Sequence, residues 1–147
     1  MKITTQGDVL QEKLSTAARF TSSLPGLSET LRGVLLKGDR EGLHIYATNL
    51  SSYYHAVLPL NMGEDVRAVI DTKKIIEFLS LLGGGALDIE IEKNALRIRK
   101  GETTGVFPLI SRDDFPLPPE IKSEGQEIDT EFFLQTLPLV LFSASKD

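Results

Sequence analysis

The sequence contains no cysteine, which excludes disulfide bonds and metal sites built from thiolate ligands. No apolar run comes near the ~20 residues that a membrane-spanning helix needs. The segment from Met1 to Thr4 lacks the apolar stretch of a signal peptide. The absence of cysteine fits a reducing compartment, although it is compatible with any other. We therefore expect a cytoplasmic protein with no membrane partner.

Positively charged residues are fewer than negatively charged ones. The 147 residues include 16 lysines and arginines against 21 aspartates and glutamates, which gives a formal net charge of −5. This balance argues against a nucleic-acid binder that depends on bulk positive charge. It leaves open a binder whose positive charge is confined to one face of the molecule. The length favours one domain that is large enough to bury a core.

Side chains that could perform catalysis are sparse. The two histidines, His44 and His55, fall on different expected strands, and no acidic or metal-ligating partner is evident at a suitable spacing. The glycine-containing runs 83–85 and 101–105 lack the Gly-Lys-Ser/Thr ending of a phosphate-binding loop. We therefore expect no enzyme, no cofactor and no bound metal, and we interpret both histidines as strand-surface residues.

Hydrophobic periodicity divides most of the chain into two similar blocks. The carboxylate of Asp8 is expected to cap a helix that runs to Phe20. The apolar stripe of this helix is formed by Leu10, Leu14, Ala17 and Ala18. The strands of the first block are expected at residues 1–5, 30–37, 43–48 and 53–60.

The second block repeats the same order of elements, which is a strand, a helix and three strands. Its helix is expected to start at a cap formed by Asp71 and Thr72 and to end at the glycines 83–85. Its strands are expected at residues 66–70, 87–91, 96–99 and 106–110. A duplicated β-α-β-β-β unit predicts an α+β domain with two helices on one side of antiparallel sheets.

Prolines at 116, 118 and 119 predict an extended linker that closes a first domain covering residues 1–120. Residues 121–128 are expected to hold the linker and a first strand, and residues 129–147 a helix that contains Pro138. The apolar spacing of that helix repeats the spacing of the first helix, so the chain is expected to begin a second copy of its own domain. Without a sheet to cover, this helix should pack on another copy of the chain or fold back on the first domain.

Several short segments resemble the bacterial DNA sliding clamp, which is the beta subunit of DNA polymerase III. They are Met1 to Thr4, Val34 to Lys37, Gly42 to Leu50, Lys73 to Glu77, Asp113 to Pro116 and Phe142 to Asp147. The resemblance implies a DNA-clamp fold and a non-catalytic processivity factor without cofactors. Subunits of that family join head to tail into a homodimeric ring, whose helices line the hole and which encircles duplex DNA without sequence specificity.

The resemblance also implies partners and site residues. DNA polymerase and the clamp loader would bind through domains absent from this chain. The DNA-facing positions would be Lys73, Arg19, Lys13 and Ser23. The subunit interface would include Lys74, Leu81, Thr104 and Phe107. The family often has an arginine in the loop that holds Ser23 and arginines on the strand that holds Thr104, and this chain has neither.

Three functions remain open from the sequence. The first is a fragment of a sliding clamp that tethers a replicative polymerase to DNA. The second is a diverged clamp-fold protein-interaction module with no DNA role, which the missing arginines favour. The third is a small hydrolase, which is disfavoured because no cluster of acid, base and nucleophile is visible. The tyrosines at 46, 53 and 54 could stack on bases, but we interpret them as surface packing on the outer side of the sheet.

Overall fold

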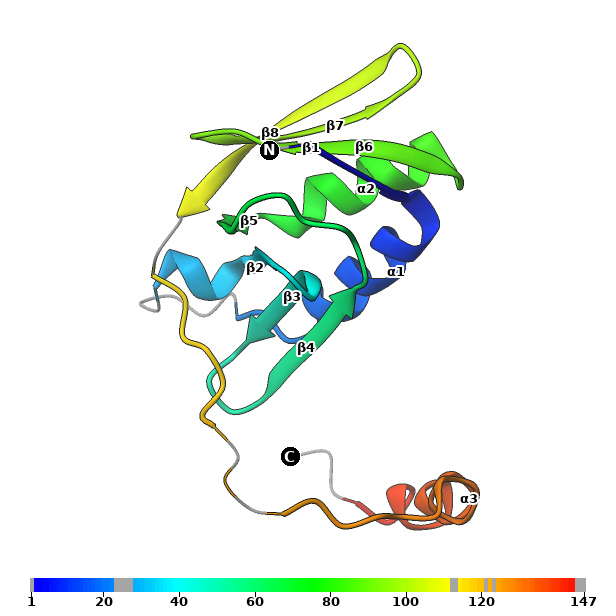
Figure 1. The fold of residues 1–147 in the computed structure, drawn as a ribbon. Helices are drawn as coiled ribbons and strands as arrows, with labels where there is room; N and C mark the ends of the chain where they lie inside the picture. The colour runs from blue at the N-terminus through cyan, green and yellow to red at the C-terminus, as the bar shows by residue number, and fades with distance from the viewer. Residues whose placement is uncertain (1, 23–27, 112–113, 121, 123, 145–147) are drawn as a thin grey trace.

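Two strand–helix units make up the body of the protein (Figure 1). The computed structural model describes residues 2–22, 28–111, 114–120, 122 and 124–144. The first unit consists of β1 (Lys2–Gln6), α1 (Gly7–Ala18), the 3₁₀ helix η1 (Glu29–Arg32), β2 (Val34–Asp39), β3 (Gly42–Thr48) and β4 (Tyr53–Leu58). The second consists of β5 (Val66–Ile70), α2 (Thr72–Leu82), β6 (Ala86–Ile91), β7 (Ala95–Lys100) and β8 (Thr103–Ser111). A further helix, α3 (Thr130–Leu141), follows the linker.

The eight strands form one antiparallel sheet in the order β1-β6-β7-β8-β5-β2-β3-β4. Each unit gives its first strand to the other unit, because β1 pairs with β6 and β5 pairs with β2. A short pairing joins the two halves, with Val69 opposite Ser111 and Ile70 opposite Leu109. The duplicated β-α-β-β-β unit and the α+β class expected from the sequence are confirmed.

The core lies between the two helices and one face of this sheet. The apolar stripes of the helices supply the fully buried Leu10, Leu14, Ala17, Ile75 and Leu79. The helices also contact one another, so both lie on the same side of the sheet (Figure 1). Burying an aliphatic side chain of this size contributes about 1.5–3 kcal/mol. The apolar periodicity of the sequence therefore fixes which side of each helix faces inward.

Helix α2 is held at both ends by side chains. The carboxylate of Asp71 accepts a hydrogen bond from the backbone N–H of Lys73 at 3.0 Å, as the sequence predicted. Gly83 ends the helix with a φ of 67°, a conformation that favours glycine. The amine of Lys100 donates to the carbonyl of Leu82 at 2.7 Å, which places a positive charge at the negative end of the helix dipole. No local signal predicts this last contact, because Lys100 lies on β7.

The start of α1 differs from expectation. The helix begins at Gly7 directly after β1, and its cap position is Gln6, which makes no side-chain cap bond. Asp8 lies inside the first turn and is not the cap. The backbone N–H of Gly7 donates instead to the carbonyl of Gly85 at 2.8 Å. The prediction was wrong because this contact with a distant loop anchors a helix that starts before Asp8, and a residue inside the first turn is not in the cap position.

The strand expected from Thr30 begins only at Val34. Residues Glu29–Arg32 form the 3₁₀ helix η1, in which the hydroxyl of Ser28 accepts a bond from the backbone N–H of Thr30 at 3.4 Å. A local side-chain acceptor of this kind competes with strand pairing, so the segment turns before it enters the sheet.

The segment after the linker also departs from expectation. Residues 124–129 form no strand, and none of the described strands pairs with them. Residues 121 and 123 of the expected segment lie outside the described residues. The expected helix is present as α3, with Pro138 inside it and the side chain of Asp129 capping it through Phe132. None of its residues is buried, and it stands apart from the first domain (Figure 1). Folding back on that domain is therefore wrong, and packing on another copy stays a prediction.

Two leucines on α2 provide a matched test of the core. Leu79→Ala should lower the free energy of unfolding by about 2–5 kcal/mol, because Leu79 is 1 % exposed and its removal leaves a cavity. Leu81→Ala should change it by less than about 0.5 kcal/mol, because Leu81 is 85 % exposed. Urea denaturation of both variants measures the difference. Equal losses would contradict the arrangement of α2.

Candidate functional site

The outward sides of α1 and α2 form a single polar surface, which we call the helix face. Within the two helices, the C-cap residue of α1 and the N-cap residue of α2, the basic side chains are Lys13, Arg19, Lys73 and Lys74. The acidic side chains are Asp8, Glu12, Asp71 and Glu77. Four basic residues and four acidic ones leave this face without net charge, whereas the whole chain carries −5. The fold therefore separates a side without net charge from an acidic remainder.

Three of the four expected DNA-facing residues lie on the helix face. Lys73 is exposed in the first turn of α2, and Arg19 is exposed at the end of α1. Lys13 is partly buried, and its amine lies 3.9 Å from the carboxylate of Glu12. Ser23 lies outside the residues that the structure describes. The structure thus brings these lysines and the arginine to one side of the sheet but does not test their role.

The first half of β8 presents a free backbone edge. It pairs with β7 from Thr103 opposite Lys100 to Pro108 opposite Ala95. It pairs with β5 only at Leu109 and Ser111. Within the described part of the chain, residues 103–107 therefore have a partner strand on one side only. An unpaired edge of this kind is a template for pairing with another strand.

The four residues expected at a subunit interface lie around this edge. Phe107 packs edge-on against Phe78 of α2, with ring centroids 5.5 Å apart. Lys74, Phe78 and Leu81 recur at i, i+4 and i+7, so they share one side of α2. Lys74 and Leu81 are exposed there, and Thr104 is exposed on β8. Helix and strand together build one surface with an apolar centre and a free strand edge.

Gly105 leaves space beside β8 for an aromatic side chain of α2. A Cβ atom built at Gly105 would lie 2.7 Å from the ring of Phe78. The aromatic pair of Phe78 and Phe107 therefore occupies the space beside the strand. The apolar character of the surface is supplied by the helix and by Phe107.

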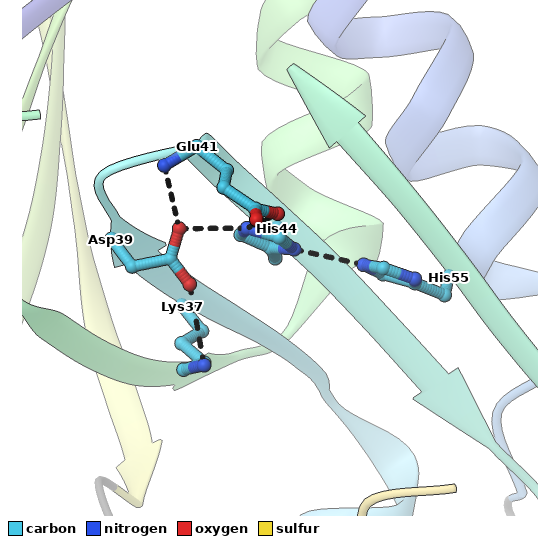
Figure 2. Close-up of polar contacts among 5 residues, drawn as sticks. All are labelled: Lys37, Asp39, Glu41, His44 and His55. Atoms are coloured by element: carbon cyan, nitrogen blue, oxygen red, sulfur yellow. Dashed lines mark hydrogen bonds and ion pairs between the residues drawn. The ribbon is translucent and has the colours of Figure 1, made fainter. Parts of the chain in front are cut away.

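The two histidines contact one another, which the sequence analysis missed (Figure 2). His44 Nδ1 lies 2.9 Å from His55 Nε2, and His44 Nε2 lies 2.9 Å from Asp39 Oδ1. His44 is buried, so its interpretation as a surface residue was wrong. The β3–β4 register places His55 opposite Tyr46, one position along the same face from His44. That hairpin register was the signal that could have revealed the pair.

The electrostatics of this cluster follow from its hydrogen bonds. The backbone N–H of Glu41 donates to Asp39 and lowers the pKa of that carboxyl, and the side chains of His44 and Lys37 lower it further. Burial lowers the pKa of His55, with smaller contributions from the nearby His44 and Lys37. Asp39 is therefore a carboxylate at neutral pH and His55 is neutral there.

The tyrosines divide between the two faces of the sheet. Tyr46 stacks on His55 with ring centroids 4.3 Å apart, on the face away from the helices. Tyr54 stacks on Phe20 at 5.5 Å and packs against the core on the helix side. Tyr54 was expected on the outer side, so that interpretation was wrong. The alternation of side chains along β4 decides its placement.

Solved structures of bacterial DNA polymerase III beta subunits share this architecture. The beta subunit of Thermotoga maritima matches with a TM-score of 0.83 and 24% sequence identity, over 99% of this chain and 40% of that one. The sliding clamp of Bacillus subtilis matches with a TM-score of 0.75 and 19% identity, over 85% of this chain and 35% of that one. The chain has the sliding-clamp fold. It spans 40% of the length of the Thermotoga protein and 35% of the length of the Bacillus protein.

A third structure with the sliding-clamp fold contains a bound peptide. The Helicobacter pylori beta clamp bound to a DNA ligase peptide matches with a TM-score of 0.73 and 20% identity, over 83% of this chain and 34% of that one. No protein-family model and no curated protein matches the chain. Among the described helices, none is long and apolar enough to cross a membrane. At sequence identities of 19–24%, these similarities establish the fold of the chain.

The pKa of His55 predicts a loss of stability as the pH falls. The folded state holds this pKa below the value of 6.5 that the unfolded chain retains, so the unfolded chain takes up the proton first. The contribution of His55 is therefore fully present above pH 6.5 and is lost as the pH falls toward the lowered folded value.

Urea unfolding between about pH 7.5 and pH 5, with no added metal ions, measures this effect. The stability of His55→Gln should fall less over that range than the stability of the unmodified protein. Parallel pH profiles for the two proteins would show that His55 does not carry the effect.

Proposed function

We propose that this chain is part of a DNA sliding clamp, which encircles duplex DNA without sequence specificity and tethers a replicative polymerase. The observation that carries this proposal is the fold, which matches a bacterial beta subunit over 99% of the chain with a TM-score of 0.83. The role is mechanical and non-catalytic. It requires a surface that faces DNA, a surface that closes the ring, and a location with the chromosome in the cytoplasm.

The helix face suits contact with sliding DNA. A sliding contact needs shallow interactions with phosphates, because side chains that read base edges would hold the ring at one sequence. Arg19, Lys73 and Lys13 supply positive charge, while acidic neighbours such as Glu12 and Glu77 leave the face without net charge. Such a face attracts phosphates weakly and does not hold the DNA at one fixed position.

The surface around β8 suits ring closure. In a head-to-tail homodimer, a strand of the neighbouring subunit would extend the sheet along the free edge of residues 103–107. Phe78 and Phe107 supply apolar contact area beside that edge, and the exposed Leu81 adds to it. Polymerase and clamp loader are partners that we propose for the whole protein. The ligase peptide on the Helicobacter clamp supports peptide binding as their mode of attachment.

A second function is a clamp-fold module that binds proteins and not DNA. The weak charge of the helix face favours it, as does the absence of arginine in the loop that holds Ser23 and on the strand that holds Thr104. The two functions differ in a direct way. A ring held only by topology stays on closed circular DNA, whereas an interaction module has no such preference.

Retention on DNA tests the clamp role in the complete protein, loaded onto nicked circular plasmid. The protein should stay on the circle during gel filtration and leave once the plasmid is linearised, because topology and not tight binding holds it. Equal retention on both forms would contradict a clamp held by topology, and no retention on either form would favour the interaction module.

Charge-matched variants test the helix face by equilibrium DNA binding at several salt concentrations. Lys73→Gln should weaken equilibrium DNA binding at low salt and reduce the salt dependence by about one unit of slope, as expected for one lost phosphate contact. Lys93→Gln makes the same charge change in the exposed turn before β7, and should leave both quantities unchanged. Equal effects of the two variants would argue against a specific role for the helix face.

Leu81→Glu tests the ring interface. Its side chain is exposed, so the folded domain should keep its stability, while a charge beside Phe78 and the β8 edge should weaken self-association. Sedimentation equilibrium of the complete protein measures the dimer constant. Leu117→Glu, which replaces an exposed leucine on the linker, is the control and should leave the constant unchanged. Unaltered association of Leu81→Glu would remove Leu81 from the interface.

A further inference from the structure

A cluster of potential metal ligands lies at the β2–β3 turn, on the face of the sheet opposite the helices. The residues are Asp39, Glu41 and His44, each of which offers one ligand atom, and these atoms lie within 4.8 Å of one another. Figure 2 shows the three side chains converging above the turn. The alternation along β3 directs Leu43 and Ile45 into the core and His44 to the opposite side. The cluster is therefore separate from the helix face.

The distances between the ligand atoms are close to those around a metal ion. His44 Nε2 lies 2.9 Å from Asp39 Oδ1 and 4.0 Å from Glu41 Oε2. Ligands at about 2.0–2.2 Å in a tetrahedral arrangement stand roughly 3.3–3.6 Å from one another. Small movements reach that geometry, since the side chain of Glu41 is 81 % exposed and free to turn. The side chain of His44 is 6 % exposed and provides a fixed point.

The contact with His55 supplies the orienting partner that metal-binding histidines usually have. His44 Nδ1 lies 2.9 Å from His55 Nε2. An ion on Nε2 of His44 leaves the ring proton on Nδ1, and that proton is then donated to His55. An outer partner of this kind fixes the ring orientation and strengthens the ligand. Tyr46 stacks on His55 and holds it in place.

The surroundings leave room for an ion. The three residues line a hollow that is also bordered by Lys37, Arg40 and Asp65. The amine of Lys37 lies 3.3 Å from Oδ2 of Asp39. Oδ1 accepts from the backbone N–H of Glu41 at 3.0 Å and lies 2.9 Å from His44 Nε2, so an ion would replace the contact between Oδ1 and His44. The open side of the hollow gives water access to a fourth coordination position.

We propose that Asp39, Glu41 and His44 bind a divalent transition-metal ion of the Zn²⁺ class, with His55 as the orienting partner of His44. One imidazole and two carboxylates suit Zn²⁺. Mg²⁺ and Ca²⁺ prefer oxygen ligands alone and bind such a set poorly. The ion joins the β2–β3 turn to the body of the sheet, so its binding stabilises the folded state. This site does not depend on the role in DNA replication.

Calorimetric titration of the protein with Zn²⁺ tests the site. One equivalent should bind, and Mg²⁺ should give no such saturation. Glu41→Gln and Asp39→Asn should each weaken Zn²⁺ binding at least ~10-fold, and His55→Gln should weaken it by about 10–100-fold as an outer partner does. Glu12→Gln removes the same charge from an exposed position on α1, and should leave the affinity unchanged.

A spectroscopic measurement separates loss of binding from loss of folding. Bound Co²⁺ should give visible absorption bands that disappear in Glu41→Gln, whose circular dichroism should match that of the unmodified protein because its side chain is exposed. Absence of a saturable equivalent of Zn²⁺ would overturn the proposal. Unchanged affinity in Glu41→Gln and Asp39→Asn would overturn it too. In either case the chain from Asp39 through His44 to His55 serves only to brace the hairpin.

Discussion

The fold depends on two apolar helix stripes that share one face of a reciprocally paired sheet. Leu14 of α1 and Leu79 of α2 are buried on that face, and the helices contact one another there. Neither unit can cover its helix alone, because β1 belongs to the sheet of the second unit and β5 to the sheet of the first. The two halves therefore fold as one body. The polar sides of both helices face away from the sheet as a consequence.

This constraint distributes the chemistry over separate surfaces. The helix side receives scattered lysines and acidic residues with little net charge, which suits weak contact with a polyanion. The junction between the halves is short, so β8 keeps an unpaired edge beside Phe78 and Phe107. The opposite face of the sheet receives every second residue of β3, and His44 and Tyr46 lie there. Each surface follows from strand alternation and from the incomplete pairing of the two halves.

Local signals predicted well where the physics is local. The bounds of β5, the cap at Asp71 and the end of α2 at Gly83 all depend on groups within a few residues of one another. Prediction failed where a distant group decides the outcome. The bond from Gly7 to Gly85 starts α1 before Asp8, and none of the described strands pairs with residues 124–129. A strand-like segment forms a strand only if a neighbour exists to pair with it.

The sequence by itself determined the order of the elements, the duplication and the inward side of each helix, because these follow from the spacing of apolar residues along the chain. The tertiary structure alone decided which polar residues meet. His44 and His55 are eleven positions apart, and only the β3–β4 register places Nδ1 of His44 2.9 Å from Nε2 of His55. Phe78 and Phe107 meet because α2 crosses β8. Such contacts depend on pairing and packing between elements, which periodicity along one segment does not encode.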